Sequence, residues 1–206
     1  MQTKKYGNIK SVSLKIAGIK TIFKDHLYSV QYEVCSESEF TRLFNLWKNP
    51  ENVDLFIDTY KDLMISPFWV AQGISASYAR RLITQEAVAT ESHFLDLYLN
   101  TINGDVPDFN QEFVFLDKQV FEFRLRSKHK MYGTHGKDCP SFLRIYAIKV
   151  ENNCFLITGG AIKLTHRMDE AEYLQEEVRK LNTVHDWLEQ EYILDVEDLN
   201  NYESYE

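Results

Sequence analysis

Cysteine, proline and glycine are all scarce in this sequence of 206 residues, which contains three, four and eight of them. The cysteines (Cys35, Cys139 and Cys154) are scattered, odd in number and in no Cys-x-x-Cys pair. This pattern argues against a disulfide framework and against a cysteine zinc site. We therefore expect a soluble protein of a reducing compartment, the cytoplasm.

Long apolar runs are absent as well. The longest, residues 145–148 and 154–158, are far too short to cross a bilayer. The first residues, Met1 to Lys5, lead into alternating polar and apolar positions and do not resemble a signal peptide. We expect no membrane association.

Several common site motifs are also missing. The sequence has no GxxxxGK[ST], no GxGxxG after a strand, no HExxH and no GxSxG. None of the six histidines lies four residues from another, so no spacing indicates a metal site. The lone pair Gly159-Gly160 could let a backbone approach phosphate, but such pairs more often mark a bulge or a strand exit. We expect neither a metal nor a cofactor.

Charge is distributed unevenly along the chain. The formal net charge is -8, but residues 1–115 carry -3, residues 116–168 carry +6 and residues 169–206 carry -11. A basic body followed by an acidic end suggests that the body meets phosphate and that the end shields it when unoccupied. The alternative is that both are solvated surface, which is the commoner origin of charge blocks.

Hydrophobic patterns predict an α+β fold. Residues 11–16 and 28–34 alternate as half-buried strands do, with a turn at Gly18 or at Lys24-Asp25. Apolar residues at three- and four-residue spacing predict helices. These begin at Ser36 and at Pro50, and two longer ones cover residues 75–100 and 169–192.

The C-terminal half adds short strands. They are predicted at residues 114–116, 120–126, 142–150 and 154–158. The last two are joined by Glu151-Asn152-Asn153, a connection of hairpin length. A long loop is predicted between the strands 120–126 and 142–150, over residues 129–141. Residues 195–206 are acidic and are expected to be an ill-ordered tail.

Cations and rings gather on these strands. Arg124 and Arg126 share one face of the strand 120–126, and Arg144 and Tyr146 share one face of the strand 142–150. Cations neutralise phosphates, and aromatic or imidazole rings stack on splayed bases, so this combination suits RNA. The plainer interpretation is an antiparallel sheet with one solvated, charged face.

Three strand motifs and a charged helix follow one another in this half. The motifs are Val120-Phe121-Glu122-Phe123-Arg124, Phe142-Leu143-Arg144-Ile145-Tyr146 and the segment from Cys154 to Thr165. In this order they resemble the RelE/ParE/HigB superfamily of bacterial toxins over about residues 85–192. That family shows a Leu-Trp-Glu-Leu-Arg-like strand, an Arg-x-x-Tyr strand, and a strand ending in Gly or Phe before Lys and Thr.

The resemblance implies a small antiparallel sheet packed with helices. Its RelE and HigB branches imply a metal-independent endoribonuclease of a toxin-antitoxin system, which cuts mRNA on the ribosome and has an antitoxin protein as partner. Such an enzyme orients the 2′-oxygen for in-line attack and stabilises the transition state with cations. The ParE branch implies instead a protein that poisons a topoisomerase by contact.

The candidate site residues are the cations and proton-exchanging groups of this region. The catalytic candidates are Arg144, Lys163, His166, His135 and Tyr146. The candidates for RNA binding are Arg124, Arg126, Lys128, Lys130, Lys137 and Arg167.

We expect three parts in the chain. They are an N-terminal α+β region over residues 1–84 with no assigned role, a RelE-like basic sheet domain over 85–194, and the acidic tail 195–206. The alternative function is a non-enzymatic interaction protein that inhibits or regulates a protein partner. Convergence of Arg144, Lys163 and His166 with Arg124 favours the ribonuclease, whereas scatter of these residues favours the alternative.

Overall fold

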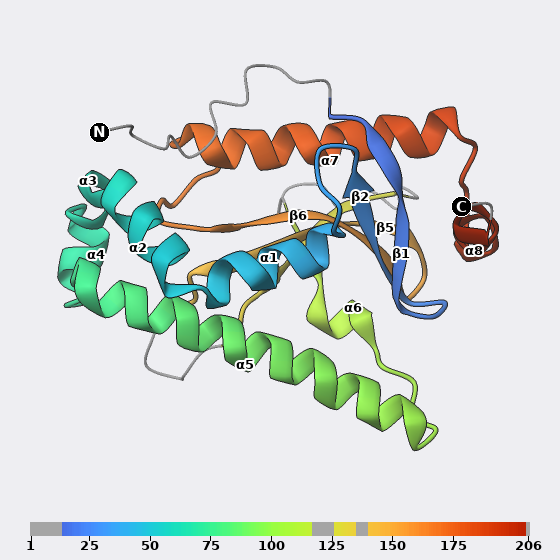
Figure 1. The fold of residues 1–206 in the computed structure, drawn as a ribbon, viewed down its shortest axis with the longest axis horizontal. Coiled ribbons are helices and arrows are strands. Elements are labelled where there is room, and N and C mark those ends of the chain that lie inside the picture. Colours follow the sequence, from blue (N-terminus) through green and yellow to red (C-terminus); the bar gives the residue numbers. More distant parts are fainter. Residues whose placement is uncertain (1–13, 117–125, 135–139, 205–206) are drawn as a thin grey trace.

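A six-stranded mixed sheet lies at the centre of the computed structural model, which describes residues 14–116, 126–134 and 140–204 (Figure 1). The strand order is β1-β2-β6-β5-β4-β3. The strands are β1 (Ile16–Phe23), β2 (Leu27–Tyr32), β3 (Val114–Phe115), β4 (Lys128–Tyr132), β5 (Leu143–Glu151) and β6 (Cys154–Ile162).

Neighbouring strands are antiparallel except at one place. There, Leu27–Ser29 of β2 runs parallel to Phe155–Ile157 of β6. The predicted α+β class is confirmed, but the sheet is larger than the expected C-terminal one, because the N-terminal hairpin β1-β2 joins it. The predicted boundary after residue 84 lies inside a continuous helix.

Helices cover both faces of the sheet. They are α1 (Glu39–Lys48), α2 (Pro50–Thr59), α3 (Lys61–Met64), α4 (Pro67–Ala71), α5 (Ala76–Ile102), α6 (Phe109–Glu112), α7 (Glu172–Gln190) and α8 (Val196–Ser204). In the described part of the chain, no helix is long and apolar enough to cross a membrane.

Local sequence signals explain where the main helices begin and end. The Ser38 hydroxyl accepts a hydrogen bond from the Thr41 backbone N–H at the start of α1, as a cap residue should. Asn49 caps α2, and Pro50 occupies its first turn. The long helix α5 ends at Asn103, followed by Gly104 with φ of +94°.

Two hydrophobic cores lie on opposite faces of the sheet. On one face, α1, α2 and α5 bury aromatic residues such as Phe44, Trp47 and Phe94 against β5 and β6. On the other face, α7 buries Leu174 and Leu181, with further leucines along the same stripe. Figure 1 shows α7 along one side of the sheet and α1 and α5 along the other. The fold is therefore a three-layer arrangement with the sheet in the middle.

The pair Gly159-Gly160 lets both layers approach β6. A Cβ atom at Gly159 would overlap the Glu177 carboxylate of α7. A Cβ atom at Gly160 would lie 2.7 Å from the Arg144 carbonyl oxygen and 2.8 Å from Leu43 Cδ1 of α1. Of the alternatives raised from the sequence, the structure gives this pair a packing role.

Two local predictions are corrected, and of the two turn positions left open, Lys24-Asp25 is confirmed. The first strand is β1 at Ile16–Phe23, and its turn lies near Asp25, with φ of +67°, so Gly18 is inside the strand. The start of the predicted loop 129–141 is strand β4, because His129 packs between Phe115 and Phe155 and is buried.

The expected ill-ordered tail is wrong over its described residues. Residues 196–204 form α8, with Leu199 wholly buried against the α7 core. The Tyr28 hydroxyl donates to Asn200 Oδ1 at 2.7 Å, which fixes α8 beside the N-terminal hairpin. Of the predicted strand 120–126, only Arg126 lies within the described residues.

Replacing Gly160 by alanine is expected to lower the free energy of unfolding by about 1–3 kcal/mol, because the new methyl group meets a backbone carbonyl that cannot rotate away. Urea denaturation at pH 7 measures the change. Ser77→Ala, on the exposed surface of α5, is the control and should stay within about 0.5 kcal/mol of the parent. Equal stability of Gly160→Ala and the parent would contradict this packing.

Candidate functional site

Strand register brings several predicted site residues to one face of the sheet. Tyr132 of β4 pairs with Arg144 of β5, and Arg144 pairs with Ala161 of β6. Directly paired residues share a face, as do residues two apart on a strand, so Lys130 and Lys163 belong to this face too. We refer to Lys130, Tyr132, Arg144 and Lys163 as the cation cluster.

An exposed ring lies at the centre of the cation cluster. The Arg144 guanidinium carbon is 4.0 Å from the centroid of the Tyr132 ring, and the Lys130 ammonium is 5.7 Å from it. Tyr132 remains 41% exposed. A cation stacked on an accessible ring offers a phosphate contact and a base-stacking surface side by side.

The three cations of the cluster have neutral hydrogen-bond partners. Arg144 donates to the carbonyl oxygens of Ser141 and Leu143 and to the Ser141 hydroxyl, at 2.7–3.1 Å. Lys163 donates to the His166 carbonyl at 2.8 Å, and Lys130 donates to the Leu116 carbonyl at 3.4 Å. Within residues 14–116, 126–134 and 140–204, no carboxylate forms an ion pair with any of them. Among the described residues, Glu86 and Glu170 act on Arg144 and Lys163 only at longer range, without an ion pair.

The environment of Lys163 favours its neutral form. Partial burial, and then the charges of Arg144 and Lys130, lower the pKa of Lys163 to about 8. A lysine with this pKa is partly deprotonated near neutral pH and can accept a proton. Burial also lowers the pKa of Arg144, which nevertheless stays charged.

A buried carboxylate in α5 positions Arg144. Glu86 accepts hydrogen bonds from the Phe142 and Leu143 backbone N–H groups, at 2.8 and 3.2 Å, and from the Ser141 hydroxyl. Ser141 in turn accepts from Arg144 at 2.8 Å. Burial raises the pKa of Glu86, against these hydrogen bonds. Sequence analysis missed Glu86, although a lone glutamate on the apolar face of a long helix is a usable signal.

The same helix holds the strand that precedes residues 135–139. The Thr134 backbone N–H donates to the Thr90 hydroxyl at 2.8 Å, and a Cβ atom at Gly133 would overlap the Glu86 carboxylate. Since Glu86 also binds residues 141–143, both described segments that flank 135–139 are tied to α5.

Other predicted RNA-binding cations are engaged elsewhere. Arg126 donates to the Ile193 carbonyl at 2.8 Å, and its side chain is only 10% exposed. Lys128 donates to the Asn182 side chain of α7. Arg167 is exposed but paired with Asp169 at 2.7 Å. The structure therefore does not bring these three into the cation cluster.

The catalytic candidates divide in the same way. Arg144 and Lys163 lie close enough for the charge of one to lower the pKa of the other, and the backbone carbonyl of His166, whose side chain is exposed, accepts a hydrogen bond from Lys163. Tyr146 must be removed from the catalytic candidates, because it is fully buried beneath α7 and its hydroxyl donates to Met168 Sδ at 3.1 Å. Burial raises the pKa of Tyr146 strongly. His135, and the predicted RNA-binding residues Arg124 and Lys137, lie outside the described residues.

The acidic C-terminal segment does not cover the cation cluster in this structure. Lys163 precedes the first turn of α7, whereas α8 follows the last, and α7 is about 28 Å long at 1.5 Å per residue. Figure 1 shows α8 beyond the C-terminal end of α7. Residues 196–204 therefore do not shield the cation cluster, whereas Glu189 and Asp169, earlier in the acidic end, pair with Arg126 and Arg167 of the basic body.

One group of potential metal ligands occurs among the described residues. It consists of His185, Asp186 and Glu189 on α7, whose ligand atoms lie within 4.8 Å of one another. The two carboxylates are exposed, and exposed acidic groups of this kind are common without a metal. Cys35 and Cys154 are free thiols in this structure.

Comparisons with known proteins do not assign the site. No protein-family model matches the chain, and no curated protein or solved structure is significantly similar to it. The resemblance to the RelE/ParE/HigB superfamily therefore rests on the sequence motifs alone.

The Lys163 side chain is expected to lower the free energy of unfolding at neutral pH. Its pKa of about 8 in the folded protein lies below the lysine value of 10.5, so the unfolded chain binds more protons between these values and stability rises with pH there. Lys163→Met should be more stable than the parent at pH 7, and its advantage should shrink between pH 8 and about 10.5. Urea denaturation across this range measures it.

Lys24→Met, at the exposed β1-β2 turn, is the matched control and should show no such pH-dependent advantage. A Lys163→Met variant that is less stable than the parent at pH 7 would show that Lys163 stabilises the fold.

Proposed function

We propose that this protein is a metal-independent endoribonuclease of the RelE/HigB type, the toxin component of a bacterial toxin-antitoxin system that cuts mRNA at the ribosome. The supporting observation is the cation cluster: three cations without a carboxylate partner among the described residues, gathered around an exposed tyrosine. An RNA strand supplies both groups that such a surface binds, namely phosphates and splayed bases.

The proposed reaction uses the RNA's own 2′-oxygen. The neutral Lys163 amine takes the proton of the 2′-hydroxyl, and the 2′-oxygen attacks the adjacent phosphorus in line. The bond from phosphorus to the 5′-oxygen breaks, and an acid returns a proton to that oxygen. The products are a 2′,3′-cyclic phosphate and a 5′-hydroxyl end, so no metal or cofactor is consumed.

Each residue of the cluster has one role in this proposal. Arg144 stabilises the negative charge that gathers on the phosphoryl oxygens, and Lys130 holds a neighbouring phosphate. Tyr132 stacks on a base. His166, which follows Lys163 closely and is exposed, is the candidate acid. Glu86 is a positioning residue that acts through Ser141 and Arg144.

Cleavage should depend on the cluster and not on added metal. Purified protein with single-stranded RNA in EDTA should yield 5′-hydroxyl ends, and Arg144→Gln should lower kcat by about 100-fold or more, as for loss of one donor to a transition-state oxyanion. In bacteria, induced expression should arrest translation, and an Arg144→Ala/Lys163→Ala double variant should not.

Lys24→Gln is the matched cation control and should act like the parent in both assays. Salt-sensitive RNA binding without cleavage would refute the nuclease, and translation arrest that persists in the double variant would refute this site. Salt-insensitive association with a protein, and none with RNA, would favour the alternative of a non-enzymatic interaction protein.

The rate should report the protonation of Lys163. Since the neutral amine is the base, kcat/KM should rise with pH to an inflection near 8, the pKa of Lys163. Arg144→Gln removes a neighbouring positive charge, which should move the inflection to higher pH while burial still keeps it below 10.5. An inflection that Arg144→Gln leaves in place would identify a base other than Lys163.

A further inference from the structure

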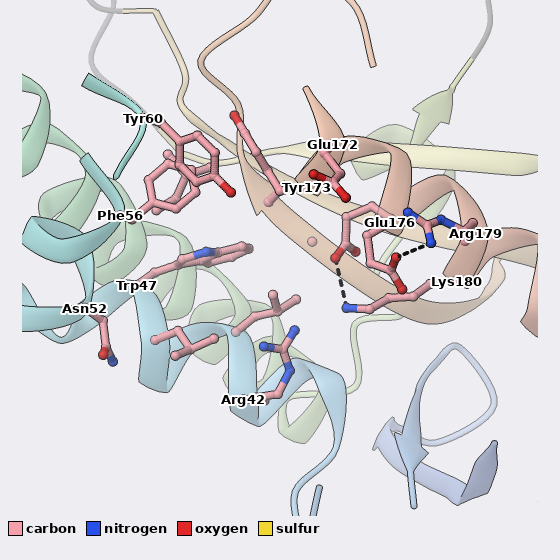
Figure 2. Close-up of a pocket in the computed structure, with 16 residues that line it drawn as sticks. Arg42, Trp47, Asn52, Phe56, Tyr60, Glu172, Tyr173, Glu176, Arg179 and Lys180 are labelled. Carbon is pink, nitrogen blue, oxygen red and sulfur yellow. Dashed lines mark hydrogen bonds and ion pairs between the residues drawn. The ribbon is translucent and has the colours of Figure 1, made fainter. Parts of the chain in front are cut away.

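A cavity of about 380 Å³ opens at the edge of β6, on the far side of this strand from β5. It lies between α1 and α2 on one side and α7 on the other. Figure 2 shows Trp47, Phe56 and Tyr60 on the first wall, opposite Glu172 and the other charged residues of α7.

The floor of this cavity is a strand edge without a neighbouring strand. Within the described residues, the part of β6 that pairs with β2 is Phe155–Ile157. Farther along β6, Gly160, Ala161 and Ile162 line the cavity, and they have a neighbouring strand, β5, on one side but no described strand on the other. In an antiparallel ladder, alternate residues direct N–H and C=O away from the partner strand. The Tyr32 hydroxyl satisfies one such group, the Thr158 carbonyl, at 2.8 Å. At the other end, the Leu164 N–H donates to the Tyr173 hydroxyl at 3.3 Å, so residues 160–162 are the stretch of edge left between these two contacts. Addition of an extended peptide to such an edge is a common mode of peptide recognition.

The cations of the cavity are already neutralised. Arg42 binds both oxygens of Glu39, at 2.5 and 2.8 Å. Lys180 lies 3.1 Å from Glu39 and 2.8 Å from Glu177, and Arg179 lies 3.1 Å from Glu176. An anion would have to displace a carboxylate from each of them, so the cavity is a poor site for phosphate.

One carboxylate at the cavity has no such partner. Glu172, in the first turn of α7, forms no ion pair within the described part of the chain. Burial raises the pKa of Tyr60, and the negative charge of Glu172 is close enough to raise it further. The nearby rings form a compact group: Tyr173 has its centroid 4.6 Å from Tyr60 and 5.2 Å from Phe56. A free carboxylate beside clustered aromatic rings is a site for an organic cation.

We propose that this cavity binds an arginine or lysine side chain of an extended segment of a partner protein. The peptide backbone adds to the open edge of β6 at residues 160–162. The cationic head lies between Glu172 and the rings of Phe56, Tyr60 and Tyr173. This surface is distinct from the cation cluster, and the proposal does not depend on ribonuclease activity.

The test titrates the full-length, ¹⁵N-labelled protein with three small probes, followed by amide chemical shifts. Nα-acetyl-arginine N-methylamide carries the cation and a peptide backbone. Nα-acetyl-citrulline N-methylamide keeps the backbone and shape without the charge, and agmatine keeps the guanidinium without the backbone. The arginine probe should bind with a Kd on the order of 1 mM and shift the amides of residues 160–162 and 172–173. Both other probes should bind at least about fivefold more weakly.

Two variants on α7 connect the binding to Glu172. Glu172→Gln should weaken the arginine probe by about fivefold and leave the citrulline probe unchanged. Glu191→Gln, exposed and outside the cavity, is the matched control and should leave both unchanged. Glu172 is itself exposed, so its replacement should not disturb folding.

Four results would overturn the proposal. The first is that the arginine probe causes no saturable shift at the cavity up to about 10 mM. The second and third are that the citrulline probe or agmatine binds as tightly as the arginine probe. The fourth is that Glu172→Gln does not change the binding of the arginine probe. AMP that shifts these amides more than the arginine probe would also overturn it, in favour of a nucleotide site. Lys130→Gln, in the cation cluster, should weaken RNA binding without affecting the arginine probe, so the two proposals can fail separately.

Discussion

A buried ion-pair network connects the two helical layers at the open edge of the sheet. Glu39 and Arg42 belong to α1, on one face, and Glu177 and Lys180 belong to α7, on the other. They meet beside Gly159, just beyond the residues of β6 that pair with β2. Loss of one member of such a buried pair typically costs about 3–5 kcal/mol, because the other charge is left without compensation.

The network also determines which surfaces are electrostatically available. Burial opposes the ionisation of Glu39, but Lys180 and Arg42 still hold its pKa below the usual value. Burial raises the pKa of Glu177, whose Oε2 atom has no hydrogen-bond partner. These cations are therefore committed to the protein's own carboxylates, whereas no described carboxylate forms an ion pair with those of the cation cluster. This difference in pairing is the basis for proposing an anionic ligand at the cation cluster and a cationic one at the cavity.

Much of the fold follows from local sequence patterns. The regular spacing in α5 and α7, the helix start at Pro50 and the hairpin from β5 to β6 are all predictable, because each depends on neighbours in the chain. The helix predicted to begin at Ser36 begins later, at Glu39, after the cap residue Ser38. The parallel contact between β2 and β6 and the docking of α8 depend on residues far apart in the sequence, which periodicity does not report. Strand β4 was missed because its Lys-His-Lys start is polar, although His129 is buried among aromatic rings.

The candidate site shows the same division. Strand parity correctly placed Arg144 and Tyr146 on one face, but it could not show that α7 covers Tyr146 and leaves Arg144 beside Tyr132. Glu86 was not found, because its hydrogen bonds to residues 141–143 arise from the packing of α5 on the sheet. A single sequence identifies which residues carry charge, whereas burial and ion pairing decide which charges remain free.

The parallel contact between β2 and β6 has a consequence for how the chain reaches its native state. The Tyr32 hydroxyl bonds to the Thr158 carbonyl across 126 residues of sequence, and the N-terminal hairpin finds its place in the sheet only when β6 is present. Contacts of such long sequence separation slow folding, since a large loop must close before they form. During synthesis, the β2 side chains of the core beneath α7, such as Val30, cannot pack against α7 until most of the chain has left the ribosome. That interval is the stage at which a chaperone or a premature contact with another chain has the greatest effect.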